Sequence, residues 1–410
     1  MPLIYLALAA LSFIIICNKI KNDVLHPVAI LTSMWFLTAS TASLQWGIYQ
    51  QEWSFIVHLT IICSGILCWA SGYFTIRQTL KTITAEQPVN GTYRIVTRVV
   101  FVVLLICVLY VLTKNEIGLN YLQNLDGLDI KTVISDKLSD ISSFESYLIN
   151  LFPFCAIFSF FELVYTDKGK HHFIYNTIVI LIVFLYCLKV IYSRGTLLYL
   201  LLGFMFIYNS KRKISIRTLA VAAVGILVLL GIMMQTRVFS ESVVFANVEH
   251  ISNPILVSAY NYISYSFENL NIVVQNGSRY MIFANVFQSL YKIFGIYDPI
   301  QTITNDVAGV FNSLTWLSPF FDDLGFFGVL LYPMLIGAFL SHFYNKSKYN
   351  KYYILLLAVL QKAIFVPFFG NYFLTSLSVM FPYVVTGILC FLCRKIKIIL
   401  PEIKFTLARR

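Results

Sequence analysis

Arginines in this chain adjoin strongly apolar segments, where a charged side chain is costly and usually serves a function. Arg194 lies in the sequence Tyr-Ser-Arg-Gly-Thr between two apolar runs, and Arg237 directly follows another such run. A guanidinium group can bind phosphate through two parallel hydrogen bonds. The two arginines therefore indicate a site for a phosphate or pyrophosphate that is attached to a membrane-resident molecule.

The residues around Arg194 favour the same chemistry. Gly195 permits a tight turn, and Ser193 or Thr196 can cap a helix that begins here. The N-terminus of such a helix offers free N–H groups and the positive end of the helix dipole, both of which favour an anion. Three further cations could join the site or, alternatively, only contact lipid headgroups: Lys189, Arg279 and Lys362.

Acidic, histidine and aromatic residues supply candidates for other roles. Asp322 and Asp323 precede an apolar run, where an acid either caps the following helix or holds an arginine or a sugar hydroxyl. His250 could act as a base at neutral pH, because the ordinary pKa of histidine is about 6.5. The amphipathic rings of Trp and Tyr suit a polar, ring-shaped ligand, and the candidates are Trp316, Tyr260 and Tyr265.

The elements that must position these residues are membrane helices. Of the 410 residues, 59% are apolar and 12% are charged, whereas soluble domains average about 25% charged residues. Because apolar runs of about 20 residues recur, we expect an all-α, polytopic membrane protein with about eleven transmembrane helices. The expected spans are 2–17, 25–46, 53–76, 95–113, 147–166, 173–191, 195–209, 218–234, 324–343, 352–369 and 372–393.

The connections between these spans alternate in charge. Lysine and arginine are concentrated in every second connection and in the C-terminal tail, for example at 211–217, 346–351 and 394–410. By the positive-inside rule these segments face the cytoplasm. The N-terminus is then expected outside and the C-terminus inside, with the candidate site residues on the outer face.

The spans divide the chain into three expected parts. Residues 1–234 form an N-terminal bundle with an acidic outer loop at 114–146, residues 235–321 form a long outer loop, and residues 322–410 supply the last helices and a basic tail. Long loops in compact proteins usually carry function. Within the long loop, Ala259, Tyr262, Ile263, Ser266 and Leu270 share one helical face, which predicts a helix at the membrane surface that caps the bundle or serves as a substrate platform.

The sequence offers no cluster of metal ligands. All eight cysteines fall in or at the ends of apolar runs, which is typical of small buried hydrophobes rather than of a disulfide framework or a metal site. We therefore expect no metal, no other cofactor and no nucleic acid.

Together these features resemble a Wzy-type oligosaccharide repeat-unit polymerase, the O-antigen or capsule polymerase of bacterial inner membranes. The resemblance rests on the number of spans, on Ser-Arg-Gly at 193–195 opening a helix, on Arg237 after the next span, and on an Asp-x-Gly-x-x-Gly pattern at the end of the long outer loop. That pattern runs from Asp323 to Gly328, with Leu324 where the family would have an aromatic residue.

The resemblance implies a C-type glycosyltransferase that works at the periplasmic face. Such an enzyme moves a growing glycan from undecaprenyl pyrophosphate to the non-reducing end of a new lipid-linked unit, with no nucleotide sugar or metal, and a chain-length regulator protein is a partner to look for. Cations that stabilise the leaving pyrophosphate would then be the main catalytic tool: Arg194, Arg237 and Arg279. The candidates for a general base are His250, Asp323 and Glu268.

Two other functions fit parts of the sequence. A flippase for the same lipid-linked sugar would usually show two related halves, and this chain shows no internal repeat. A ligase would use the same donor with a different acceptor, and the sequence alone leaves that alternative open.

Overall fold

The computed structural model describes residues 1–20, 23–77, 89–115, 142–166, 170–189, 194–215, 217–218, 221, 248–280, 283–285, 287–288, 291, 294–295, 313–373 and 377–395. Within these ranges the regular secondary structure is helical, and one isolated antiparallel bridge pairs Gly47 with Val248. The helices are α1 (Pro2–Lys19), α2 (Pro27–Ala42), α3 (Phe55–Thr75), α4 (Gly91–Lys114), α6 (Ser143–Leu151), α7 (Phe154–Tyr165), α8 (Lys170–Lys189), α9 (Arg194–Lys211), α11 (Pro254–Asn276), α13 (Ser318–Ser347), α14 (Tyr352–Val359), α15 (Gln361–Phe365) and α16 (Leu377–Lys395).

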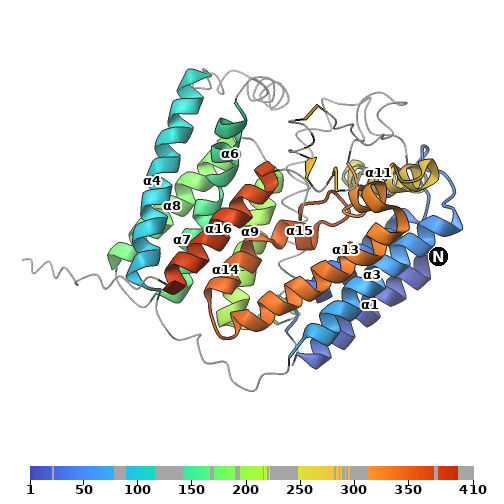
Figure 1. Ribbon diagram of the computed structural model, residues 1–410, viewed down its shortest axis with the longest axis horizontal. Helices are drawn as coiled ribbons and strands as arrows, with labels where there is room; N and C mark the ends of the chain where they lie inside the picture. The colour runs from blue at the N-terminus through green and yellow to red at the C-terminus, as the bar shows by residue number, and fades with distance from the viewer. Residues whose placement is uncertain are drawn as a thin grey trace, which may run out of the picture.

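The helices form two groups that α13 connects (Figure 1). In the first group α1 packs on α2, and α3 lies along the length of α13. In the second group α7 packs on α8 and α9, while α14 and α16 pack on one another. The helix α13 slants from the first group to α14 in the second, so its two ends lie at opposite ends of the bundle.

Six helical segments of the described chain are long and apolar enough to cross a membrane. They are Pro2–Lys19, Phe55–Thr75, Gly91–Lys114, Phe144–Tyr165, His171–Leu188 and Ser318–Ser347. The outer surface of the bundle is correspondingly apolar: on α4, Ile106 and Tyr110 are each 61% exposed. A stripe of this kind is unfavourable in water and matches lipid chains, so it indicates a membrane protein.

Prolines account for two of the places where the observed helices depart from the expected spans. The span expected at 352–369 is divided into α14 and α15. The second of these helices ends at Phe365, because the next residue, Val366, has a φ of −122° and a ψ of 51°, which are not helical. Pro367 disfavours helical geometry in the residue before it. Likewise Pro153 separates α6 from α7 within the span expected at 147–166. Most of the span expected at 218–234 lies outside the described residues, so the number eleven remains a prediction.

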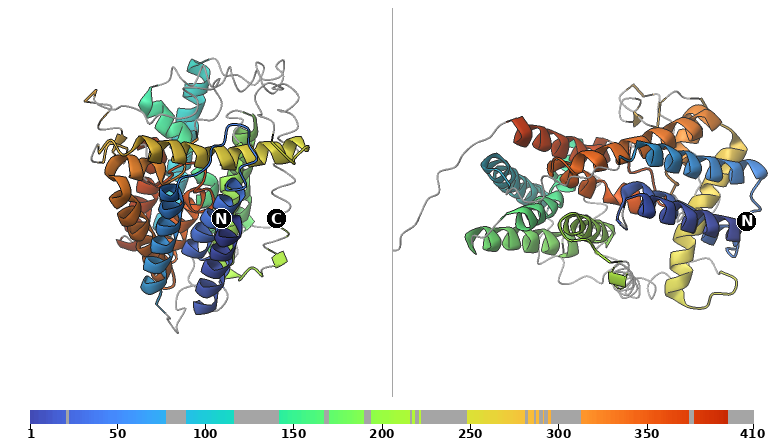
Figure 2. Two further views of the ribbon diagram at one scale, coloured as in Figure 1. Left: turned by 90° about the vertical axis from the view of Figure 1, so that its right-hand side faces the viewer. Right: turned by 90° about the horizontal axis from the view of Figure 1, so that it is seen from below.

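The basic residues that end many helices gather at one end of the bundle. Lys19 donates to the carbonyl of Tyr73, and the backbone N–H of Arg77 donates to Asn345, which joins the ends of α1, α3 and α13. We call this end the basic end. The opposite end is crossed by α11, which lies over the ends of α2, α3 and α13 (Figure 2), and we call it the α11 end.

The middle of α11 is more deeply buried than a surface helix would be. Ser266 and Leu270, two members of the expected apolar face, are fully buried, and the other three are half-buried. Polar residues of the same helix are also buried, among them Asn261, Glu268 and Asn269. The position of α11 across the bundle end therefore agrees with the expected cap. Its middle, including these polar side chains, is buried, unlike that of a helix that only rests on a surface.

Cysteine labelling should separate the two ends. In a variant without the native cysteines, Asn276→Cys at the α11 end should react with a membrane-impermeant maleimide in intact spheroplasts. Ser215→Cys, beyond the basic end of α9, should react only after the membrane is opened, because basic connections stay on the cytoplasmic side. Both positions are exposed. Labelling of Ser215→Cys from outside would reverse the assigned orientation.

Candidate functional site

The start of α13 is kinked, and the kink explains the Asp-x-Gly-x-x-Gly pattern. Gly325 has φ 61° and ψ −146°, a backbone conformation that is largely restricted to glycine. A Cβ atom on Gly328 would lie 2.1 Å from the carbonyl oxygen of Phe320. The chain after the kink therefore packs directly against the turn before it.

Asp322 and Asp323 lie in the short helical segment ahead of this kink. The N-cap of α13 is Leu317, which makes no side-chain capping bond. The helix thus begins earlier than the expected 324, and neither aspartate caps it. Both side chains are almost fully buried, so each carboxylate needs partners within the protein.

Arg279 is the partner of Asp322. Its Nε donates to Oδ1 at 2.8 Å and its terminal NH2 group to Oδ2 at 2.5 Å, the bidentate geometry in which an arginine binds a carboxylate most strongly. The Asp322 side chain is 4% exposed and the Arg279 side chain is 29% exposed. The structure therefore shows the alternative in which an acid holds an arginine, and part of the arginine side chain remains exposed.

Asn285 binds both aspartates and completes the cluster. Its backbone N–H donates to Oδ1 of Asp323 at 2.9 Å, and its side-chain amide donates to Asp323 and to Asp322, each at 2.7 Å. Asp323 is thereby engaged in holding the segment that follows α11, and it is fully buried. Sequence reasoning missed Asn285, because a lone asparagine 37 residues from Asp322 carries no pattern that points to it.

Alanine at Gly325 should disturb this cluster. The added Cβ would lie 3.1 Å from the hydroxyl of Tyr280 and 3.4 Å from Cβ of Ser278, and these two residues flank Arg279. The alanine would also have to keep a positive φ of 61°, which is unfavourable for a residue with a side chain. We expect a loss of about 1–3 kcal/mol in stability, measured by thermal unfolding in detergent. Gly387→Ala on α16, where no atom lies within 4 Å of the new Cβ, is the matched control. Equal unfolding midpoints for both variants would contradict this reading of the kink.

Glu268 lies in a second polar cluster, on α11. Trp53 Nε1 donates to one carboxylate oxygen at 3.3 Å and the amide of Asn271 to the other at 2.9 Å. The side chain is 1% exposed, and burial raises the pKa of its carboxyl above the ordinary 4.5. A raised pKa suits a general base or acid, although this carboxyl is enclosed in the present arrangement.

The raised pKa of Glu268 predicts a pH dependence of stability. Above pH 4.5 the native protein holds the Glu268 proton more firmly than the unfolded chain does. Stability should therefore fall as the pH rises through the window between the two pKa values. Glu268→Gln should flatten that slope in thermal unfolding, whereas Glu249→Gln, at a side chain that is 72% exposed, should leave it unchanged. An identical slope in wild type and Glu268→Gln would count against a buried, titrating carboxyl.

The three aromatic candidates for sugar binding are buried in this arrangement. The Trp316 indole is 1% exposed and packs against Trp35 and Phe373, with ring centroids 5.8 and 6.1 Å away. Tyr260 is 4% exposed, and its hydroxyl donates to Gln50 at 2.6 Å. Tyr265 is fully buried. The three rings are covered by protein in this arrangement, and their role in sugar stacking stays a prediction from the sequence.

His250 is the exposed member of the three candidate bases. Its side chain is 71% exposed and lies 4.0 Å from Glu249, and its ring stands edge-on to Trp46 at a centroid distance of 5.6 Å. Backbone pairing of the 248–249 segment with Trp46 and Gly47 holds the histidine beside the connection between α2 and α3. His250 is therefore open to solvent, whereas Asp323 and Glu268 are enclosed.

The structure describes the positions of three of the four remaining candidate cations. Arg194 is the first residue of α9, and Lys189 is the last residue of α8, as the expected turn between those spans requires. The ammonium of Lys362 in α15 lies 3.8 Å from the ring centroid of Tyr372, a cation–π contact. Arg237 lies outside the described residues. Among the described residues, Arg279 is the candidate cation that forms an ion pair in this cluster, with Asp322.

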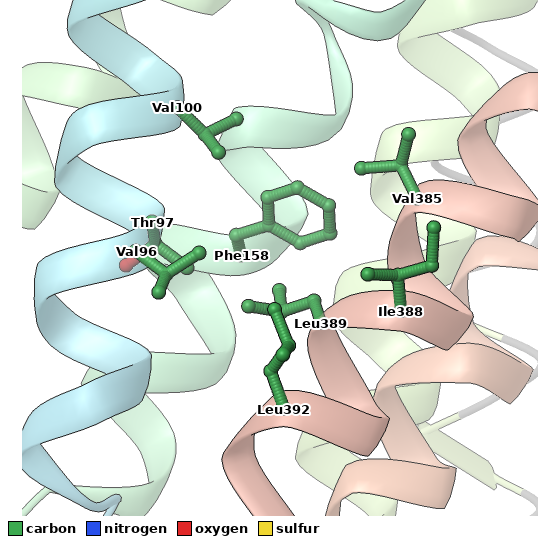
Figure 3. A pocket seen from close by; sticks show the side chains of 8 residues that line it. All are labelled: Val96, Thr97, Val100, Phe158, Val385, Ile388, Leu389 and Leu392. Atoms are coloured by element: carbon green, nitrogen blue, oxygen red, sulfur yellow. The ribbon is translucent and has the colours of Figure 1, made fainter. Parts of the chain in front are cut away.

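An apolar cavity lies elsewhere, between α4, α7 and α16 (Figure 3). Its volume is about 190 Å³, and the side chains around it include Val100, Phe158 and Leu389. Thr97, the polar residue of the lining, follows Arg94 by one turn of α4 and donates its hydroxyl to the carbonyl of Tyr93. The cavity is therefore close to Arg94 on α4, and it shares no lining residue with the cluster at Asp322.

Among the residues whose structure is described, no three His, Cys, Asp or Glu side chains come close enough to hold a metal ion. Comparisons of the chain with protein-family models, with curated proteins and with solved structures found no match.

Proposed function

We propose that this protein polymerises oligosaccharide repeat units that are linked to a polyprenyl pyrophosphate, at the outer face of a bacterial inner membrane. The growing glycan would leave its lipid pyrophosphate and join the non-reducing end of a new lipid-linked unit. The bond between the anomeric carbon and the pyrophosphate oxygen breaks, the acceptor hydroxyl oxygen forms the new glycosidic bond, and the hydroxyl proton passes to a base.

The observation that supports this proposal most strongly is the fixed position of Arg279. A buried carboxylate in the kink of α13 orients the guanidinium with two hydrogen bonds, yet 29% of the arginine side chain stays exposed. A cation that is fixed in advance near the bundle end can stabilise the charge that develops on a leaving pyrophosphate without reorganising. Lipid-linked substrates would reach this end directly from the bilayer.

A second feature agrees with the proposal at the start of α9. Arg194 is the first residue of that helix, where the backbone N–H groups and the helix dipole favour an anion. We assign pyrophosphate binding to Arg194, Arg237 and Arg279, with Lys189 and Lys362 as further cations. His250 is the preferred base because it is exposed; Asp323 holds Asn285 instead.

Deletion of the encoding gene, followed by gel analysis of the surface glycan, tests this function. Loss of a polymerase should leave acceptors that carry one repeat unit. Polymer retained on the carrier lipid would instead identify a ligase, and single units trapped on the cytoplasmic side would identify a flippase. The wild-type gene supplied in trans is the control, since it should restore the long chains.

A further inference from the structure

The basic end of the bundle contains a polar cavity that the proposed reaction does not use. Its volume is about 120 Å³, several times the ~15 Å³ that one water molecule needs by the same kind of measure. The ends of α7, α9 and α13, the start of α14 and the connection before α2 all contribute to its lining. A cavity where five segments converge is well placed to hold a ligand that joins them.

Asp23 fixes one wall of this cavity. Its carboxylate accepts hydrogen bonds from Lys213, from the Tyr344 hydroxyl at 2.5 Å and from the Asn209 amide at 2.9 Å. These partners hold the pKa of Asp23 below its ordinary value in spite of burial. The aspartate is thus ionised and neutralises one cation of the lining, Lys213.

The lining nevertheless carries an excess of positive charge. It contains the lysines 213, 348 and 351 and a single acid, Asp23, which is three positive charges against one negative charge. Burial, followed by the charges of Arg94 and Lys211, lowers the pKa of Lys351 to about 8. Burial and the charge of Lys213 likewise lower the pKa of Lys348, against the attraction of Asp23. The pKa of each lysine is thus lowered, so an anion bound in the cavity would stabilise their charged forms.

Hydroxyl groups and apolar side chains complete the lining. The Ser210 and Ser347 hydroxyls donate to backbone carbonyls of their own helices, α9 and α13, so an oxyanion here would be bound chiefly by lysine ammonium groups. Phe206 and Ile354 are apolar. A phosphate ester with an apolar substituent matches both features. Lysine ammonium groups between the ends of membrane helices bind such headgroups in general.

We propose that this cavity binds the phosphate of an anionic phospholipid headgroup and so ties the basic ends of α9, α13 and α14 together. Free phosphate offers the same oxyanion. The lipid is favoured because the cavity lies where transmembrane helices leave the membrane and combines lysines with apolar side chains.

Thermal unfolding of the purified full chain in an uncharged detergent tests the proposal. Added phosphatidylglycerol should raise the unfolding midpoint to a plateau, and added phosphatidylcholine should not. Lys348→Gln and Lys351→Gln should each raise the half-saturating lipid concentration about fivefold, and Lys351→Arg should restore binding. Lys346→Gln is the matched control, because Lys346 lies on the same turn of α13, is exposed and does not line the cavity.

The outcomes are separable. A plateau reached with inorganic phosphate alone would keep the oxyanion site and overturn the lipid as its source. An equal effect of Lys346→Gln, or a wild-type protein that responds alike to both lipids, would overturn the site itself. The comparison of the two lipids uses only the wild type, so it decides even if a glutamine variant does not accumulate.

Discussion

Replacing Arg194 by alanine should reduce glycan polymerisation on the order of a hundredfold, since one charge-assisted bond to a transition-state anion contributes about 2–4 kcal/mol. Arg237→Ala should be comparably harmful. Arg194→Lys should also lose much of the activity, because an ammonium lacks the planar fork that binds two phosphate oxygens at once. The prediction rests on the start of α9 at Arg194, where the helix dipole adds to the arginine charge.

The measurement is made with purified protein and a lipid-pyrophosphate-linked repeat unit, followed by a gel that resolves chain length. Arg212, which directly follows α9 at its opposite end, provides the control: it is exposed, and Arg212→Ala should polymerise like wild type. A snorkelling cation needs only charge and reach. Polymer made by Arg194→Lys at the wild-type rate would therefore show that Arg194 only anchors the helix at the interface.

Much of the helical arrangement follows from local features of the sequence. The long apolar run at 95–113 predicts a span and lies within α4, and Gly195 with its neighbours predicts the start of α9 within one residue. These predictions work because a helix in lipid must satisfy its own backbone hydrogen bonds. The break at Val366 was missed, since apolar composition continued through Pro367 and outweighed the proline.

The partners within the site depend on contacts that no local pattern encodes. The sequence suggested that an aspartate near 322 could hold an arginine, but it could not select Arg279, which is 43 residues away. Asn269 is likewise buried, and its amide donates to the carbonyl of Ser313, 44 residues away. Trp316 was a candidate because an amphipathic ring suits a polar, ring-shaped ligand. Only the packing of Trp35 and Phe373 shows that its ring is covered in this arrangement.

The pair of Arg279 and Asp322 offers the sharpest test of the proposed site, because its structural and catalytic roles can be separated. Arg279→Gln would leave the buried Asp322 carboxylate without its bidentate partner. Breaking a buried pair in this way costs roughly 3–5 kcal/mol, and the lower end of that range applies because Arg279 is 29% exposed. We expect a lower unfolding midpoint and a loss of polymerisation.

The double variant Arg279→Gln/Asp322→Asn distinguishes the two roles. It removes both charges, and the amide that replaces the Asp322 carboxylate keeps an oxygen that can accept from Asn285, as Asp322 does at 2.7 Å. Stability should therefore recover in part, because position 322 no longer carries a buried charge without its partner. Polymerisation should stay on the order of a hundredfold below wild type, because the cation that stabilises the leaving pyrophosphate is still missing. If the double variant instead recovered polymerisation together with stability, Arg279 would serve only to hold Asp322, and the pyrophosphate would have to be bound by other cations.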